Sequence, residues 1–107
     1  MRRIGSVIGI PREAVAEYER LHAEVWPTVL AQIAKSHIRN YSIFRHGDLL
    51  FSYFEYDGDD YAADMAVMAA DPETQRWWAL CNPLQRPVAE AAADEWWHEL
   101  PEVFHTD

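Results

Sequence analysis

The chain has 107 residues, a formal net charge of -9 and five tryptophans, and half of its residues are hydrophobic. This length fits one domain, residues 1–107, and the hydrophobic content excludes a disordered chain. The negative charge argues against a nucleic acid or an anionic membrane as partner, because both attract clusters of lysine and arginine.

No apolar segment approaches the about 20 residues that a membrane-spanning helix needs, and the N-terminal segment does not resemble a secretory leader. We therefore expect a cytoplasmic protein. Cys81 is the only cysteine, so neither an intramolecular disulfide nor a thiolate metal cluster is possible. We interpret it as a small buried apolar residue and not as a nucleophile.

The predicted elements begin with a strand over residues 2–10, which stops at Pro11. From there to about residue 35 the apolar residues recur at helical spacing, and Pro27 predicts a kink near the middle of this one helix. The apolar stripe of the helix includes His22 and is formed by Val15, Tyr18, Val25, Trp26, Val29 and Ile33.

Two strands are predicted next, at 38–44 and 49–56, joined by a turn in which Gly47 can supply a positive φ. Acidic residues favour the start of a second helix over 57–71. Pro72 is typical of a helix start and predicts one or two further turns.

The segment from Trp96 to the C-terminus mixes aromatic and β-branched residues, which predicts a last strand at the edge of a sheet. The element order is therefore that of an α+β, ferredoxin-like split βαβ domain. The strand over 49–56 is apolar on both faces, although only one face can be covered by helices. We expect a second copy of the sheet to cover the other face, giving a two-fold homodimer.

His22 points toward the sheet in this arrangement, one turn after Tyr18 and one turn before Trp26. One interpretation is a hydrogen-bonded core histidine beside two core aromatic residues. The other is a proton-transfer group in a ring-lined pocket, because an imidazole pKa near 6.5 suits proton transfer at neutral pH. Spacing alone leaves both open.

Trp77 and Trp78 are adjacent on a helix, so at most one of them faces the core squarely. Both can serve as packing anchors, but an indole beside a pocket can also stack on the C–H face of a sugar. Asn40, Tyr18 and Tyr41 offer groups that can hydrogen-bond sugar hydroxyls. The sequence has no glycine-rich phosphate loop, and its histidines and carboxylates have no metal-ligand spacing.

Several segments together resemble the L-rhamnose mutarotase family. The family signature Y-x-R-x-H-x-x-x-W-P resembles residues 18–27, YERLHAEVWP, and the family segment N-Y-x-I resembles residues 40–44, NYSIF. The family also has the segment QRWW, which residues 75–78 match outright. Its closing strand resembles residues 102–105, EVFH. Chain length and motif order agree as well. Arg39, where a histidine often precedes the Asn-Tyr pair, departs from the family pattern.

This resemblance implies an isomerase that interconverts the α and β anomers of L-rhamnose, built as a dimeric α+β barrel without a metal or organic cofactor. It implies that His22 is the catalytic proton donor and that Tyr18, Tyr41, Trp77 and Trp78 bind the sugar; we expect Asn40 and Trp26 to complete the site. Ring opening needs a proton delivered to the ring oxygen and another removed from the anomeric hydroxyl. The partner base stays open between water and a tyrosine hydroxyl.

Two other functions remain open from the sequence. The same scaffold can host a monooxygenase or a haem-binding protein, in which His22 would be a haem ligand. The chain can also be a non-catalytic dimer that only binds sugar.

Overall fold

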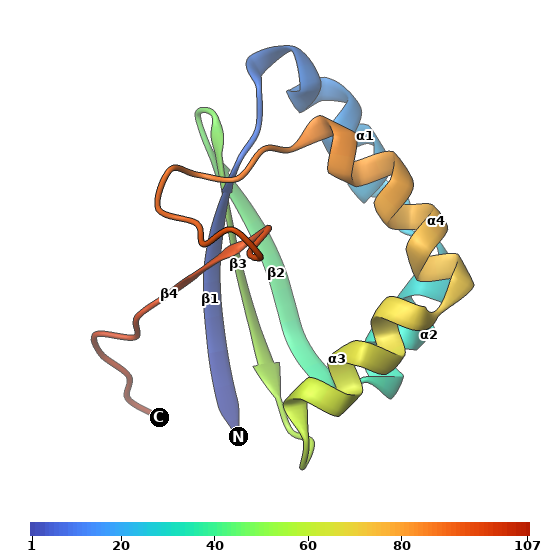
Figure 1. Cartoon of the computed structure of the whole chain (residues 1–107), viewed down its shortest axis with the longest axis vertical. Helices are drawn as coiled ribbons and strands as arrows, with labels where there is room; N and C mark the ends of the chain where they lie inside the picture. The colour runs from blue at the N-terminus through green and yellow to red at the C-terminus, as the bar shows by residue number, and fades with distance from the viewer.

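A four-stranded antiparallel sheet forms one layer of the molecule, and the helices form a second layer on one side of it (Figure 1). The computed structural model describes residues 1–107. Its strands are β1 (Arg2–Gly9), β2 (Ile38–His46), β3 (Leu49–Tyr56) and β4 (His98–Leu100), in the spatial order β2-β3-β1-β4. This order confirms the predicted α+β, ferredoxin-like fold.

The helical layer consists of four α-helices and two short 3₁₀ helices. The α-helices are α1 (Val15–Ala23), α2 (Pro27–Lys35), α3 (Tyr61–Ala70) and α4 (Pro72–Cys81), and the 3₁₀ helices are η1 (Arg12–Ala14) and η2 (Asn82–Leu84). None of these helices has the length and hydropathy required to cross a bilayer.

The prediction of one helix kinked at Pro27 is wrong, because two separate helices occupy that segment. Glu24 leaves the helical conformation at φ -138° and ψ 61°, and Trp26 is extended at φ -61° and ψ 137°. A proline disfavours helical geometry in the residue before it but fits the first helical turn itself. Pro27 therefore begins α2, and His22 lies in the last turn of α1.

Two acidic residues fix the starts of the later helices. Asp60 accepts a hydrogen bond from the Ala63 backbone N–H at 3.1 Å, so α3 begins at Tyr61, later than predicted. Asp71 accepts one from the Thr74 N–H at 2.9 Å, which makes α4 a helix of its own with a proline in its first turn.

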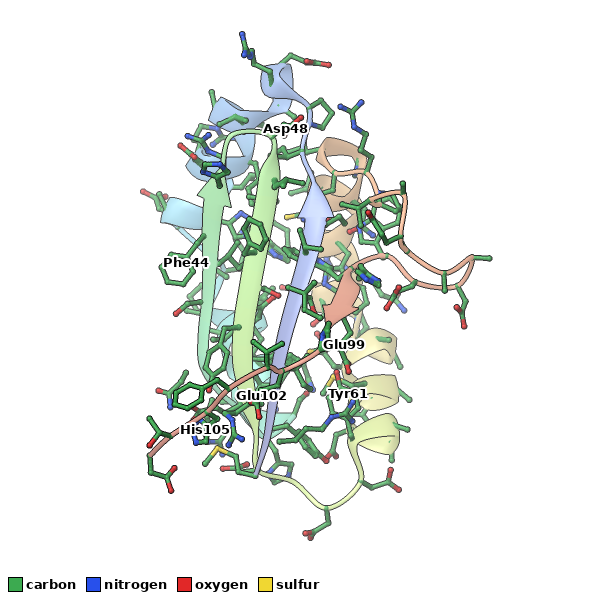
Figure 2. All side chains as sticks on the ribbon, turned by 90° about the vertical axis from the view of Figure 1, so that its left-hand side faces the viewer. Phe44, Asp48, Tyr61, Glu99, Glu102 and His105 are labelled. Atoms are coloured by element: carbon green, nitrogen blue, oxygen red, sulfur yellow. The ribbon has the colours of Figure 1, made fainter.

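The last strand is much shorter than predicted. β4 contains only three residues, and Pro101, which has no backbone N–H to donate, follows it directly. The remaining segment crosses the side of the sheet that faces away from the helices, which we call the open face; Glu102 and His105 lie in front of the strands in Figure 2. Arg3 of β1 holds this segment through an ion pair with Glu102 at 2.8 Å.

The hydrophobic core lies between the helices and the opposite side of the sheet, its inner face. Ile8 and Leu50 are almost completely buried there, and Tyr18, Trp77 and Cys81 reach them from the helices. Burial raises the pKa of the Cys81 thiol to about 11, as expected of a packing residue and not of a nucleophile.

A β-bulge in β2 decides which side chains reach the inner face. Arg39 pairs with Glu55 and Ser42 with Tyr53, so two residues of β2 stand opposite Phe54 alone. Asn40 takes a positive φ of 50° at the extra position. The alternation of side chains is thereby shifted, and Tyr41 joins Phe54 on the inner face at a ring-centroid distance of 5.4 Å.

The open face carries a band of apolar side chains without helices over it. Phe44 is 65% exposed, and Val103 and Phe104 of the C-terminal segment are 94% and 78% exposed. The expected second apolar face is therefore present in the folded chain.

Candidate active site

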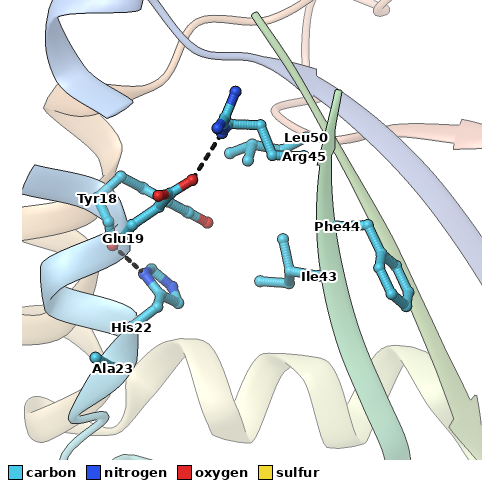
Figure 3. Close-up of a pocket in the computed structure, with 8 residues that line it drawn as sticks. All are labelled: Tyr18, Glu19, His22, Ala23, Ile43, Phe44, Arg45 and Leu50. Carbon is cyan, nitrogen blue, oxygen red and sulfur yellow. Dashed lines mark hydrogen bonds and ion pairs between the residues drawn. The ribbon is translucent and has the colours of Figure 1, made fainter. Parts of the chain in front are cut away.

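A cleft of about 280 Å³ opens between α1 and the inner face of β2 and β3 (Figure 3). Its lining residues are Tyr18, Glu19, His22, Ala23, Ile43, Phe44, Arg45 and Leu50. Ile43 and Leu50 give it an aliphatic wall, whereas the Phe44 ring points away from it. This volume is near the lower end of the roughly 300 to 1,000 Å³ typical of small-molecule sites.

Aromatic groups hold the His22 imidazole in place on the α1 side of the cleft. Its ring stacks on Tyr18, with centroids 4.1 Å apart and an interplanar angle of 24°. The edge of Trp77 contacts it at 5.2 Å, and His22 Nδ1 lies 2.9 Å from the Tyr18 carbonyl oxygen. The imidazole has one ring nitrogen committed to this hydrogen bond.

The protonation of His22 follows from this environment. A carbonyl oxygen only accepts, so Nδ1 carries the hydrogen and Nε2 has a free lone pair in the neutral ring. Burial lowers the pKa of His22 below its ordinary 6.5, although the hydrogen bond to Tyr18 acts in the opposite direction. At neutral pH the cleft therefore contains a neutral imidazole that can accept a proton.

Tyr18, which lines the same cleft, carries a buried hydroxyl. The residue is only 4% exposed, and its oxygen accepts a hydrogen bond from Gln85 Nε2 at 3.1 Å. Burial raises the pKa of Tyr18 far above its ordinary value, so the phenol keeps its proton. Sequence reasoning missed Gln85, which lies 67 positions from Tyr18 in an irregular segment without any motif.

An ion pair joins the two sides of the cleft at its mouth. Arg45 of β2 donates to Glu19 of α1 at 2.7 Å and also to the Gly47 carbonyl oxygen at 3.0 Å. Sequence reasoning missed this pair as well. The only available signal was that Glu19 is one position away from Tyr18 and three from His22.

The predicted site residues do not all meet in this cleft. Tyr18 and His22 line it, whereas Trp77 is 6% exposed and supports His22 from the core side. Trp26 packs against the edge of Trp77 at 5.2 Å, and Trp78 is half-buried against the core. Of the three indoles only Trp77 contacts the histidine, and the wall of the cleft is aliphatic instead of indole.

The two β2 residues of the predicted site are separated by the bulge. Tyr41 lies on the inner face beside Phe54. Asn40 is directed to the open face, where its amide donates to Glu55 Oε1 at 2.7 Å. The structure thus does not bring Asn40 to the cleft. No three histidine, cysteine or carboxylate side chains lie close enough together to hold a metal ion.

A family model described as L-rhamnose mutarotase matches residues 3–106. The chain is 38% identical to an L-rhamnose mutarotase of Opitutus terrae over the full length of both chains. It is 37% identical to an L-fucose mutarotase of Xanthomonas campestris, over 97% of this chain and 87% of that one.

A solved structure shows the same fold. The crystal structure of an L-rhamnose mutarotase from Formosa agariphila superposes with a TM-score of 0.78 over all of both chains, at 19% identity. Family model, relatives and fold agree along the whole length of the sequence. The chain belongs to the L-rhamnose mutarotase family.

Proposed function

We propose that this protein interconverts the α and β anomers of L-rhamnose and that His22 moves the proton. Its family makes it an isomerase of the mutarotase type. The observation that carries the residue assignment is the neutral His22 imidazole, which lines a cleft of monosaccharide size with Nε2 free. Such a cleft is too small to suit a porphyrin, which favours the sugar over the haem alternative.

The reaction begins when His22 Nε2 takes the proton of the anomeric hydroxyl. The bond between C1 and the ring oxygen breaks, C1 becomes an aldehyde carbon, and the ring oxygen takes a proton from the imidazolium. Both oxygens are bonded to C1, so one imidazole beside that carbon can serve both. The open chain then rotates about the bond between C1 and C2, and the reverse steps close the ring on the other face of the aldehyde.

The proton-donor role that the resemblance gives to His22 is the second half of this cycle. The imidazole first accepts a proton and then returns it. Tyr18 acts by hydrogen bonding instead of proton transfer, because burial raises its pKa and keeps the phenol neutral. Its hydroxyl can hold the ring oxygen near His22 while charge develops there.

The aliphatic wall supports a 6-deoxy sugar as substrate. Ile43 and Leu50 offer a surface to the methyl group that L-rhamnose carries in place of a hydroxymethyl group. A contact of this kind is worth about 1 to 3 kcal/mol of discrimination. L-fucose is also a 6-deoxy sugar, so the two sugars must be compared directly.

We also propose that the protein works as a homodimer in which the open faces of two sheets pack together. Phe44, Val103 and Phe104 are mostly exposed in the single chain. Several large apolar side chains exposed on one face are typical of an interface. Face-to-face packing would bury it in the same way as the two sheets of a sandwich.

The decisive experiment measures anomer exchange by NMR on equilibrated L-rhamnose, L-fucose and D-galactose, with wild-type protein, His22→Ala and His46→Ala. His46 is an exposed histidine at the end of β2 and serves as the matched control. We expect exchange on L-rhamnose to fall by about 10²- to 10⁴-fold in His22→Ala and to persist in His46→Ala. No exchange on any sugar contradicts the enzyme, and unchanged exchange in His22→Ala contradicts the role of the histidine.

A further inference from the structure

A series of two hydrogen bonds runs from the partly exposed Trp96 through the buried Gln85 to the buried Tyr18. Trp96 Nε1 donates to Gln85 Oε1 at 3.0 Å, and Gln85 Nε2 donates to the Tyr18 hydroxyl oxygen at 3.1 Å. Gln85 is 8% exposed and Tyr18 4%, so water has little access to the bond between them, whereas Trp96 at the other end is 40% exposed. Neither Gln85 nor Trp96 lines the cleft, but Gln85 bonds directly to the hydroxyl of Tyr18, which does line it.

The indole of Trp96 fixes which group donates and which accepts in both of these hydrogen bonds. An indole N–H can only donate, so the oxygen of the Gln85 amide must face Trp96 and its nitrogen must face Tyr18. The Tyr18 oxygen therefore accepts on this side. The hydrogen of the Tyr18 hydroxyl makes no hydrogen bond to another protein group. Without the indole, the amide could turn over, and its oxygen would then take that hydrogen.

We propose that Gln85 and Trp96 are positioning residues, which keep the Tyr18 hydroxyl an acceptor on its buried side so that its hydrogen is free for the sugar. This inference rests on the proposed function and extends it to two residues that do not touch the substrate. In this arrangement the hydroxyl meets the ring oxygen as a donor in every turnover. The proposal also gives a role to the hydrogen bond between the Trp96 N–H and Gln85, in a segment far from α1 in sequence.

The segment that carries these residues is anchored at both ends. Arg86, next to Gln85, exchanges two backbone hydrogen bonds with Gly9 of β1 at 2.8 and 3.0 Å. A Cβ on Gly9 would come within 2.9 Å of the Arg86 carbonyl oxygen, so this approach requires glycine. Near Trp96, Glu95 accepts from the backbone N–H groups of Ala92 and Glu99 at 3.1 and 3.0 Å.

Two conservative variants test the proposal. Trp96→Phe keeps a ring but loses the N–H, and we expect kcat on L-rhamnose to fall about fivefold, the effect of one neutral hydrogen bond. Gln85→Glu keeps the shape, but its carboxylate would accept from both Trp96 and Tyr18. We expect this variant to lose at least about tenfold in kcat at pH 8, since hydrogen bonds to a charged acceptor are stronger.

The pH profile separates positioning from a structural effect. Once protonated, the carboxyl group introduced by Gln85→Glu would again donate to Tyr18, so the kcat of this variant relative to wild type should rise as the pH falls from 8 toward 5. A structural defect would leave this ratio flat or lower it. Trp97→Phe is the matched control, because Trp97 packs against the core without a hydrogen-bonding role, and it should keep kcat within about twofold.

Thermal melts of each variant at both pH values show whether the fold is intact. If wild-type protein exchanges the anomers and the ratio for Gln85→Glu does not rise at low pH, this inference fails while the proposed function stands. The same holds if Trp96→Phe and Trp97→Phe have equal kcat. If wild-type protein exchanges no sugar, both the inference and the proposed function are overturned.

Discussion

The His22 imidazole stacks on the Tyr18 ring at 4.1 Å while its Nδ1 donates to the Tyr18 carbonyl oxygen at 2.9 Å. One residue therefore sets both the orientation and the tautomer of the histidine, and the same residue also lines the cleft. The spacing of four residues in one helix makes this arrangement possible. Trp77 of α4 contacts the His22 imidazole with its ring edge from another side.

The first prediction concerns the pH dependence of the reaction. Burial lowers the pKa of His22 below 6.5, so the neutral, proton-accepting form persists into mildly acidic solution. We expect exchange on L-rhamnose to be constant above pH 6.5 and to fall only below it. The unfolded chain takes up the proton at a higher pH than the folded chain does, so His22 also makes folding less stable as the pH falls below about 6.5. A rate profile whose midpoint is 6.5 or higher would contradict this assignment.

The sequence predicted the part of the site that is local. Tyr18 and His22 are four residues apart on a helical stripe, so their proximity follows from helix geometry. Element types and order also gave the sheet topology, because connections in such domains are short and follow few patterns. The effect of Pro27 was misjudged because a proline fits the start of a helix as readily as it kinks one.

The rest of the site depends on contacts between residues far apart in the chain. Gln85 reaches Tyr18, and Trp96 reaches Gln85, in a segment that the Gly9–Arg86 pairing brings back to the sheet. Asn40 and Tyr41 were expected to share the site, but a bulge shifts the alternation of β2 and places them on opposite faces. No pattern in the sequence marks an extra residue in a strand unless its pairing is known.

The second prediction concerns Glu95, which holds the segment before β4. Hydrogen bonds from His98 and from the backbone N–H groups of Glu99 and Ala92 lower the pKa of Glu95 to about 2. The stabilisation is therefore complete above the ordinary value of 4.5 and is lost as the pH falls toward 2. We expect Glu95→Gln to lower Tm at pH 7 and the difference from wild type to shrink at pH 3.

Glu90→Gln is the control for that measurement, because Glu90 is an exposed carboxylate in the same segment. Its Tm should follow that of wild type at both pH values. A Glu95→Gln deficit that is equally large at pH 3 would show that packing, and not the ionised carboxylate, holds the segment.

The third prediction tests the homodimer. Phe44→Glu places a charge on the apolar open face, where packing against a second sheet would leave it buried and unpaired. We expect wild-type protein to sediment as a dimer and this variant to sediment as a monomer at micromolar concentration. Leu80→Glu is the matched control, since Leu80 is 46% exposed but belongs to α4 on the opposite side of the molecule. A wild-type protein that sediments as a monomer would rule out this assembly.

The last prediction concerns the choice of sugar. L-rhamnose and L-mannose differ only in that L-mannose has a hydroxymethyl group where L-rhamnose has a methyl group. If that methyl group rests on the aliphatic wall, Ile43→Ser should reduce the preference in kcat/KM for L-rhamnose over L-mannose by about 10-fold, within the range for one apolar contact. Ile43→Val keeps an apolar surface and should retain most of the preference. Equal preferences in the wild type and in Ile43→Ser would mean that the sugar methyl group lies elsewhere, and Leu50, the other aliphatic residue of the wall, would be the next to substitute.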